Sequence, residues 1–436
     1  MIMKKSKKTS VILIILTFCI MFLLNTCDEG EYFPTGLPEI RIDTLNSAQI
    51  LDRETWVTMT FSLTDPVNPS NNISAIDDQQ IRGRGNASWT QTPQNGKKPY
   101  RIRFKKEQSV FGLPAARNWV LIKNGEMLNT SFGFELGKRL GLKYTCSYHH
   151  VHLYLNGDYR GLYFFTEHRQ ADPAGIGAPG RPKVDSTDGW FVEIDRYYDE
   201  APLFSTDKYN LPIMIKTPED NEVTQDGWAF GDHFNNKNTA KISQYPKFNN
   251  VVNDWKQITD LMAANDFPNN GYRELIDIDS FVKYFIVQTL VKNNDLFRPG
   301  VSTGKEIGSV YFYKDKNGKI GAGPIWDLDW SFAPWEFEGE KFLPTTAPYQ
   351  IHPWFARFHE DPAFQKRYKE IWNENYYTNI LTMEDWIDKQ GAKIKSGAEK
   401  NQERWKEGDI DWHIGHIKDY FNKRVKYLNN VYQKIN

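Results

Sequence analysis

The chain has 436 residues, of which 40% are hydrophobic and 14% aromatic, and its formal net charge at pH 7 is −1. This composition is typical of an ordered globular protein, since disordered chains are poor in aromatic residues and carry a high net charge. Basic residues number 54 against 55 acidic ones, so there is no excess of positive charge to hold nucleic acid, and we expect no nucleic-acid partner.

The N-terminal residues are typical of a secretory leader. Lysines within residues 4–8 precede an apolar run over 11–24. At about fourteen residues this run is shorter than the roughly 20 that a membrane-spanning helix needs. We therefore predict a lipoprotein signal peptide over 1–26 and a short tether over 27–36. An uncleaved membrane anchor is the alternative, and it would place the protein on the same side of the membrane.

Loss of the leader would change the charge and the cysteine content. Residues 1–26 contain four lysines and no acid, so the remaining chain would carry 50 − 55 = −5. Cys19 lies in the leader and Cys27 directly follows it, which leaves Cys146 as the one internal cysteine. If Cys27 carries a lipid, Cys146 has no cysteine to pair with, no internal disulfide can form, and stability must come from a buried core.

Strand signals dominate the first half of the chain, where apolar and polar residues alternate. Asn156-Gly157 lies between two such segments and is the strongest hairpin signal in the sequence. A helix is predicted over 131–140, ending at Gly141. The predicted strands are 39–43, 55–63, 98–105, 118–123, 151–155, 159–167 and 190–195.

The pattern becomes helical from about residue 251. A helix capped by Asp279 or Ser280 and ending at Val291 is apolar nearly all round, which predicts burial. A second hairpin follows, from 309–313 through a turn into Trp326-Asp327. The remaining predicted helices are 363–376, 384–395 and 415–434.

These elements predict an α+β fold with a sheet-rich N-terminal part and a helical C-terminal part that begins at about residue 345. No segment has the composition of a linker, so we expect a single domain over 37–436.

Two acidic positions follow ordered elements. Asp295 ends the triplet Asn-Asn-Asp after the buried helix, and Asp327 ends the second hairpin, with Asp329 two residues further. A phosphoryl-transfer site without a Walker loop needs one carboxylate to accept the acceptor's proton and another to hold Mg²⁺. On an extended chain, Asp327 and Asp329 would share a face. A simple turn and surface carboxylates beside buried tryptophans are the plainer interpretations of these residues.

The motifs, taken in order, resemble the CotH family, kinases typified by spore coat protein H. The resemblance runs from about residue 37 to the C-terminus. It implies an atypical kinase fold and the transfer of phosphate from a nucleotide such as ATP, with Mg²⁺ or Mn²⁺, to Ser/Thr hydroxyls of a protein. The motifs are RGRGNASW (82–89), KKPYRIRF (97–104), NWVLIKN (118–124), YLNGDYRGLYFFTEH (154–168), GWFVEID (189–195), NND (293–295) and GPIWDLDW (323–330).

The resemblance implies a role for the matched acids and lysines. Asp295 would be the catalytic base, and Asp327 would hold the metal, with Asp329 as a second ligand. Lys98 would pair with the nucleotide phosphates, with Lys97 as the alternative, since strand register decides which of the two faces inward.

The remaining implied roles belong to the glycine loop and to the lysine's partner. Arg84, with the backbone of Gly83 and Gly85, would cover the phosphates, although a plain turn is the simpler interpretation of this loop. Glu167 ranks before Glu193 as the acid that pairs with the lysine.

Four positions depart from the family pattern. Ser309 stands where relatives have the Asn of the catalytic segment, and a hydroxyl ligates Mg²⁺ less well than a carboxamide, which weakens the case for a second metal ion. Asn124, Asn129 and Thr130 stand where relatives often have an Asp and an Arg-Asn pair.

The leader carries a second resemblance. Its last residues and Cys27 resemble a bacterial lipobox, and Asp28-Glu29 resembles the acidic tag of surface lipoproteins in the Bacteroidetes. The implied location is the outer membrane, facing the cell surface, with a lipid anchor on Cys27.

Two other functions fit the same residues. A glycan-binding or glycan-cleaving lipoprotein could use Glu193 and Asp195, or Asp327 and Asp329, as a carboxyl pair. A catalytically inactive CotH-like scaffold is the third possibility. The histidines at 149, 150 and 152 are predicted to pack in a strand rather than to bind a metal.

Overall fold

The computed structural model describes residues 36–171, 181–184, 188–220, 222–231, 237–293, 296, 307–332 and 352–435. From Leu37 onward the chain forms one compact unit. The leader, Cys27, the Asp28-Glu29 pair and Asp295 lie outside the described residues. Within the described ranges, no helix is long and apolar enough to cross a membrane.

Seven strands form a closed barrel in the order β1-β2-β3-β4-β5-β7-β6. Neighbouring strands are antiparallel, except that β1 pairs with β6 in parallel and so closes the barrel. Alternate residues point inward, and Ile40, Trp119 and Phe165 are fully buried there. The strands are β1 (Glu39–Thr44), β2 (Val57–Thr64), β3 (Ile73–Gly83), β4 (Tyr100–Gln108), β5 (Ala116–Ile122), β6 (Tyr148–Leu155) and β7 (Asp158–Glu167).

The hairpin prediction at β6 and β7 is confirmed. Asn156 and Gly157 have φ of 52° and 78°, the left-handed values that a two-residue turn of this kind requires. The closed barrel was not predicted, and neither was β3. The polar Asp77 to Gln80 and a positive φ at Asp78 interrupt the alternation of β3, so its strand character comes from pairing with β2 and β4.

A second sheet has the strand order β12-β11-β8-β10-β9, all antiparallel. Helix α5 covers it through Trp255, whose ring lies 5.8 Å from that of Trp190 in β8 and 5.5 Å from that of Phe312 in β11. The strands are β8 (Trp190–Ile194), β9 (Leu203–Ser205), β10 (Pro212–Thr217), β11 (Val310–Lys314) and β12 (Ile320–Ala322).

Helix α6 is the buried helix that the sequence predicts. It is joined to the second sheet by the bond from the Ala322 N–H to Ser280 Oγ, at 3.1 Å. Its cap is Asp277, which accepts from the Ser280 N–H, so the prediction of Asp279 or Ser280 as the cap was wrong by two or three residues. Both alternatives lie inside the first turn, where Asp279 forms an ion pair with Arg367 instead.

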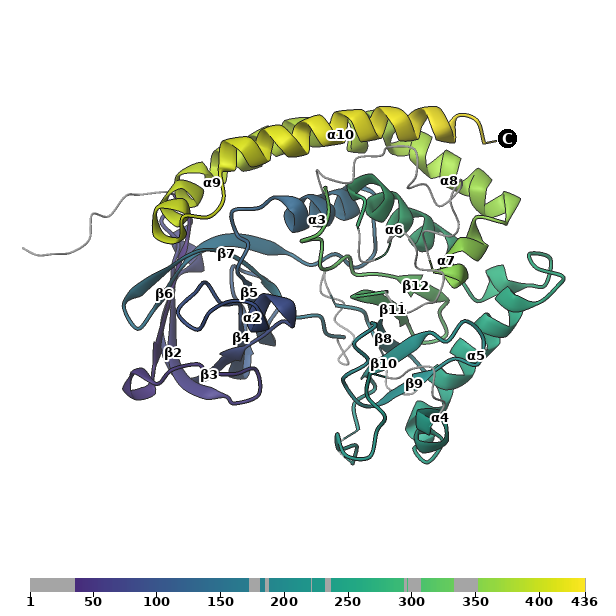
Figure 1. Ribbon diagram of the computed structural model, residues 1–436, viewed down its shortest axis with the longest axis horizontal. Coiled ribbons are helices and arrows are strands. Elements are labelled where there is room, and N and C mark those ends of the chain that lie inside the picture. Colours follow the sequence, from purple (N-terminus) through teal and green to yellow (C-terminus); the bar gives the residue numbers. More distant parts are fainter. Residues whose placement is uncertain are drawn as a thin grey trace, which may run out of the picture. The chain divides into compact units, whose positions relative to one another are not determined.

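The C-terminal helices connect the two sheets. In α9, Asn401 accepts from the Leu162 N–H of β7 at 3.1 Å, and in α10, Arg424 donates to the Thr289 carbonyl of α6 (Figure 1, yellow). The α+β class is therefore confirmed, with described strands confined to the first 322 residues. The helices are α2 (Ala87–Thr90), α3 (Asn129–Arg139), α4 (Lys237–Ile242), α5 (Asn249–Ala263), α6 (Ile278–Val291), α7 (Pro353–Phe358), α8 (Pro362–Asn375), α9 (Met383–Trp405) and α10 (Ile410–Tyr432).

Gly125, between β5 and α3, lies directly against the backbone of β7. A Cβ at this position would lie 2.5 Å from the Leu162 carbonyl oxygen and 2.5 Å from the Tyr163 carbonyl carbon. Main-chain atoms of a central strand cannot move aside as the end of a side chain can. Only glycine therefore allows this close approach, which positions Asn124 and Glu126 on either side.

We expect Gly125→Ala to lower the free energy of unfolding by roughly 1–3 kcal/mol, the usual effect of overpacking. Thermal and urea unfolding measure it. Gly415→Ala is the matched control, because a Cβ in this turn of α10 would meet nothing within 4 Å. Alanine there should leave the stability unchanged or raise it, since it favours a helix over glycine. Equal unfolding curves for the two variants would contradict the packing argument.

Candidate functional site

The C-terminal end of α6 lies beside the segment that follows β12. The Phe332 N–H, three residues after Asp329, donates to the carbonyl of Val291, the last residue of α6, at 3.0 Å. Asp295 follows Val291 by four residues and lies outside the described part of the chain. The end of α6 and the segment with Asp327 and Asp329 are thus hydrogen-bonded neighbours, although they lie 30 or more residues apart in the sequence.

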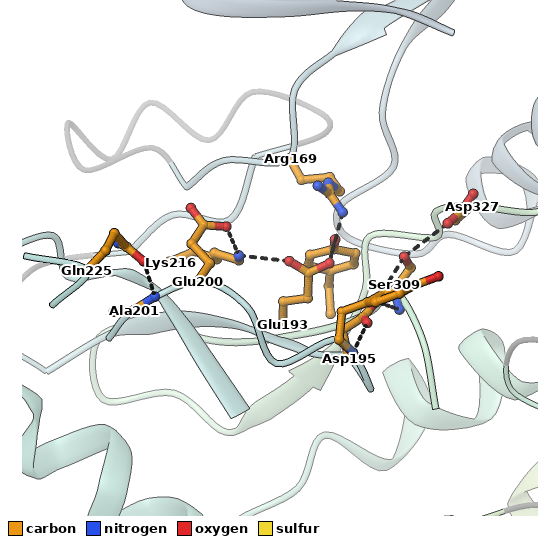
Figure 2. A network of polar contacts seen from close by, with 11 residues as sticks. Arg169, Glu193, Asp195, Glu200, Ala201, Lys216, Gln225, Ser309 and Asp327 are labelled. Carbon is orange, nitrogen blue, oxygen red and sulfur yellow. Dashed lines mark hydrogen bonds and ion pairs between the residues drawn. The ribbon is translucent and has the colours of Figure 1, made fainter. Parts of the chain in front are cut away.

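Ser309 connects two carboxylates of this region. Its hydroxyl donates to Asp327 Oδ2 at 3.1 Å, and its main-chain N–H donates to Asp195 Oδ2 at 2.7 Å (Figure 2). The residue that departs from the family pattern therefore lies in contact with the predicted metal-holding acid. It also brings in Asp195, from the end of β8, which the sequence suggested only for a glycosidase pair.

The chain is not extended at Asp327, which contradicts the premise that Asp327 and Asp329 share a face of a strand. Asp327 has a φ of 54°, in the left-handed region. Trp326 is 2% exposed, but Trp330 is 56% exposed, so one of the two flanking tryptophans is buried and the other is not. The two carboxylates are half-buried and bond to different elements.

Asn124, Asn129 and Thr130, the other residues expected to differ from the family pattern, lie around Asp329. Its Oδ2 accepts from Asn124 at 3.0 Å, and its Oδ1 accepts from the Thr130 hydroxyl at 3.5 Å. Asn129 donates to the Ser331 carbonyl at 3.0 Å and fixes the chain just beyond. Two neutral donors, Asn124 and Thr130, thus hold the carboxylate of Asp329, while Asn129 holds the main chain that follows it.

Glu193 is held by cations from two other elements. Its Oε1 lies 3.0 Å from Arg169 after β7, and its Oε2 lies 2.8 Å from Lys216 in β10 (Figure 2). Tyr311 also donates to Oε1. Both oxygens of this carboxylate are occupied by side chains of the protein, whereas a glycosidase carboxyl must be free to reach the substrate. The geometry therefore gives no support to Glu193 and Asp195 as a glycosidase pair.

Asp195 lies among backbone donors. It is 6% exposed, and its two oxygens accept from the N–H groups of Tyr197 and Ser309. Burial and the nearby charge of Glu193 raise the pKa of Asp195 to about 7, against the effect of these hydrogen bonds.

Arg84 lies in the field of the same acids. Burial and the neighbouring Arg169 lower the pKa of its guanidinium to about 10, while Asp327, Asp329 and Glu193 oppose the shift. The glycine loop after β3 therefore places its arginine near the two acids that follow β12. Arg84 thus lies within electrostatic range of Asp327 and Asp329, and their membership of one site stays a prediction.

The predicted pairing of Lys98 with Glu167 is wrong. Lys98 donates to the Trp89 and Thr92 carbonyls at 2.8 and 2.7 Å, while Glu167 forms an ion pair with Arg181 at 3.0 Å. Both lysines precede Tyr100, where β4 begins, so strand register does not decide their direction.

Lys97 has the acidic partner instead. Its Nζ lies 2.7 Å from Glu126 Oε2, and the two side chains are 5% and 12% exposed. Sequence analysis missed Glu126. The available signal was its place two residues after the NWVLIKN motif, next to the glycine that packs against β7.

The three strand histidines pack as predicted. The His149 ring stacks on Phe111 at 3.8 Å, His150 Nδ1 lies 2.7 Å from the Gly125 carbonyl oxygen, and His152 Nδ1 lies 2.9 Å from the Tyr159 hydroxyl. Burial lowers the pKa of each imidazole to about 4.

The family model described as CotH kinase protein matches residues 81–428, which begin at the end of β3 and include every motif named above. The chain belongs to the CotH kinase family. A search of the curated proteins finds no match.

The donors around Asp327 fit the hard divalent cation that a CotH kinase would use with a nucleotide. In the described ranges no three His, Cys, Asp or Glu residues gather as a metal site. Mg²⁺, however, is usually held by one or two carboxylates together with waters and substrate phosphates. The oxygens of Ser309 and Asp327 lie 3.1 Å apart, close to the roughly 3 Å between adjacent ligands of octahedral Mg²⁺.

The raised pKa of Asp195 predicts a pH dependence of stability. The folded protein retains a proton that the unfolded chain releases near pH 4, so Asp195 destabilises the fold progressively as the pH rises from about 4 to about 7. In metal-free buffer, the stability of Asp195→Asn relative to wild type should increase by roughly 2–3 kcal/mol between pH 5 and 8. Urea unfolding at each pH measures it, and a difference that stays constant would contradict the shift.

Proposed function

We propose that this CotH family member is an exported phosphotransferase that moves a phosphoryl group from a nucleotide such as ATP to Ser/Thr hydroxyls of a protein. The observation that carries the proposal is that the segment with Asp327, held by Ser309, is hydrogen-bonded to the end of α6, with the Arg84 loop within electrostatic range of Asp327. These parts come from the second sheet, the buried helix and the barrel.

In the proposed reaction, Asp295 accepts the proton of the acceptor hydroxyl. The hydroxyl oxygen forms a bond to the γ-phosphorus while the bond to the bridging oxygen of the β-phosphate breaks, and the nucleoside diphosphate leaves with that electron pair. Asp327 and Ser309 would hold Mg²⁺ or Mn²⁺, which when bound supplies positive charge to the phosphate oxygens. Asp329 is the candidate for a second ligand.

The cationic side chains would orient the nucleotide. Arg84 can donate to phosphate oxygens from the glycine loop. Lys97, fixed by Glu126, has the arrangement of a kinase's paired lysine, and we assign it this role in preference to Lys98, which donates to two main-chain carbonyls. In a partly buried site, such interactions are stronger than in water.

The metal assignment predicts that Asp327→Asn loses metal-dependent nucleotide binding and keeps the fold. In a thermal shift assay, Mg²⁺ and ATP together should raise the melting temperature of the wild type only. Saturation at one hundred times Kd stabilises a protein by about 2.7 kcal/mol. An equal shift in the variant would remove Asp327 from the metal site.

Asp295→Ala is the matched variant at the other acidic position, because a base that acts on the acceptor does not bind the nucleotide. It should show the wild-type thermal shift but transfer phosphate roughly 10²–10⁴ times more slowly. Transfer of labelled γ-phosphate to a protein acceptor measures this. If the rate matches wild type, Asp295 is a turn residue.

We also propose that the protein is an outer-membrane lipoprotein, anchored through Cys27 and directed to the cell surface by Asp28-Glu29. The support is the lysine-rich leader, the apolar run and the lipobox-like ending. Cys27→Ser should abolish lipidation, which labelling with a fatty acid detects. Neutral residues at 28 and 29 should leave the protein lipidated but protected from protease added to intact cells. Protection of the wild type would contradict the surface location.

A further inference from the structure

Three arginines on the outer face of the barrel surround one tryptophan. The guanidinium carbons of Arg82, Arg101 and Arg103 lie 4.6, 5.9 and 4.2 Å from the centre of the Trp56 ring. These four residues are termed the arginine array. Arg82 faces Arg101 directly across the β3–β4 pair, with Arg103 two residues further along β4. All four side chains are half-buried.

This arrangement is unfavourable for the protein alone. Like charges directly opposite each other destabilise a strand pair, and burial together with Arg82 and Arg103 lowers the pKa of Arg101 to about 9. The ion pair recorded for the array joins Arg82 to Glu54, at 3.7 Å, and Glu54 is 84% exposed. The Nε–H groups of Arg82 and Arg101 are buried without an acceptor in the described part of the chain.

A bound anion would relieve this repulsion. Arginine binds carboxylates and phosphates through two parallel hydrogen bonds, and a ring stacked beneath the guanidinium restricts its orientation. At physiological ionic strength charges are screened beyond about 8 Å. A ligand at the array therefore responds to these three cations more than to the net charge of the chain.

The array borders the candidate site. The half-buried His168, at the end of β7, lies in the field of Arg101 from the array and of Arg84 and Arg169 from the site; together with burial, these charges depress its pKa well below the usual value. The main chain connects the two regions as well, because the His168 N–H donates to the carbonyl of Asn118, whose side chain accepts from Arg101.

We propose that the arginine array docks an acidic, extended segment of the protein acceptor and so directs its hydroxyl to the site. This inference rests on the proposed function, because the ligand is the acceptor of the phosphotransferase. The binding of an acidic segment to the array does not depend on that function. Alternate residues of an extended chain are spaced by roughly 6.6 Å, the same spacing as Arg101 and Arg103 on their strand. A segment with Asp or Glu at every second position matches the array.

The test uses two fluorescent peptides with a central serine, one with Glu at alternate positions and one with Gln in their place. Fluorescence anisotropy, without nucleotide or metal, should show wild type binding the Glu peptide and not the Gln peptide, more weakly as salt increases. Arg101→Gln and Arg103→Gln should each weaken Kd roughly tenfold to a hundredfold, the effect of losing a charge-assisted hydrogen bond.

Arg41→Gln is the matched control. Arg41 is also a barrel arginine stacked on a ring, 4.2 Å from the centre of Tyr154, but it has a carboxylate partner in Glu39 at 3.0 Å. Its loss should leave Kd unchanged. Unchanged melting temperatures establish that the array variants are folded, and Arg103→Lys, which keeps the charge but not the planar donor pair, should lie between wild type and Arg103→Gln.

Several outcomes would overturn the inference. They are equal binding of the two peptides, equal weakening by Arg41→Gln, and tighter binding of a single-stranded oligonucleotide of the same charge. Loss of the Mg²⁺–ATP thermal shift in Arg103→Gln would assign the array to the nucleotide instead. Glu-peptide binding that persists in a protein with no nucleotide shift supports the docking surface and contradicts the proposed phosphotransferase, so the two failures are distinguishable.

Discussion

Four carboxylates, two buried and two half-buried, lie on the segments that form the candidate site, and the rest of the site follows from how each of them is stabilised. An unpaired buried charge is strongly destabilising, and each acid meets the requirement differently. Glu193 has two cations, Asp195 has two main-chain N–H groups and a raised pKa, Asp327 has the Ser309 hydroxyl, and Asp329 has neutral amide and hydroxyl donors. Any metal or phosphate that binds there enters a site with its acids already positioned.

The donors come from both sheets, which explains why the fold needs each of them. Arg169 follows β7 and Asn124 follows β5, so both belong to the barrel, whereas Lys216 and Ser309 belong to the second sheet. Helices α9 and α10 tie the barrel to α6 through hydrogen bonds to main-chain carbonyl and amide groups. The site therefore depends on long-range contacts in which no single element is sufficient.

The barrel carries the opposite charge on its outer face. There, three arginines share one tryptophan, with a single exposed acid in ion-pair range of the array in the described structure. The acids of the candidate site have their own hydrogen-bond donors or cations, and the arginines are crowded on the outer face of the barrel. This arrangement suits a protein that binds anionic groups at two neighbouring places. Phosphate oxygens and acceptor carboxylates would each meet a cation without competing for the same one.

Local patterns in the sequence determined most individual elements. Alternation identified β1, β2 and β4, the Asn-Gly pair fixed the β6–β7 turn, and apolar residues all round identified α6, because each of these signals acts over a few residues. The motifs were specific enough to indicate the CotH family, with Arg84, Asp327 and Asp329 as candidates for a common site.

Only the tertiary structure decided that the first sheet closes into a barrel and which charged side chains pair with each other. The parallel contact of β1 with β6 joins segments more than a hundred residues apart, so nothing local encodes the barrel. Lys97 pairs with Glu126 and Glu167 with Arg181 because buried charges pair with whatever the packing brings near them, which motif order does not specify. For the same reason, Asn124 and Thr130 can be recognised as hydrogen-bond donors to Asp329 only in the folded protein, where that carboxylate lies between them.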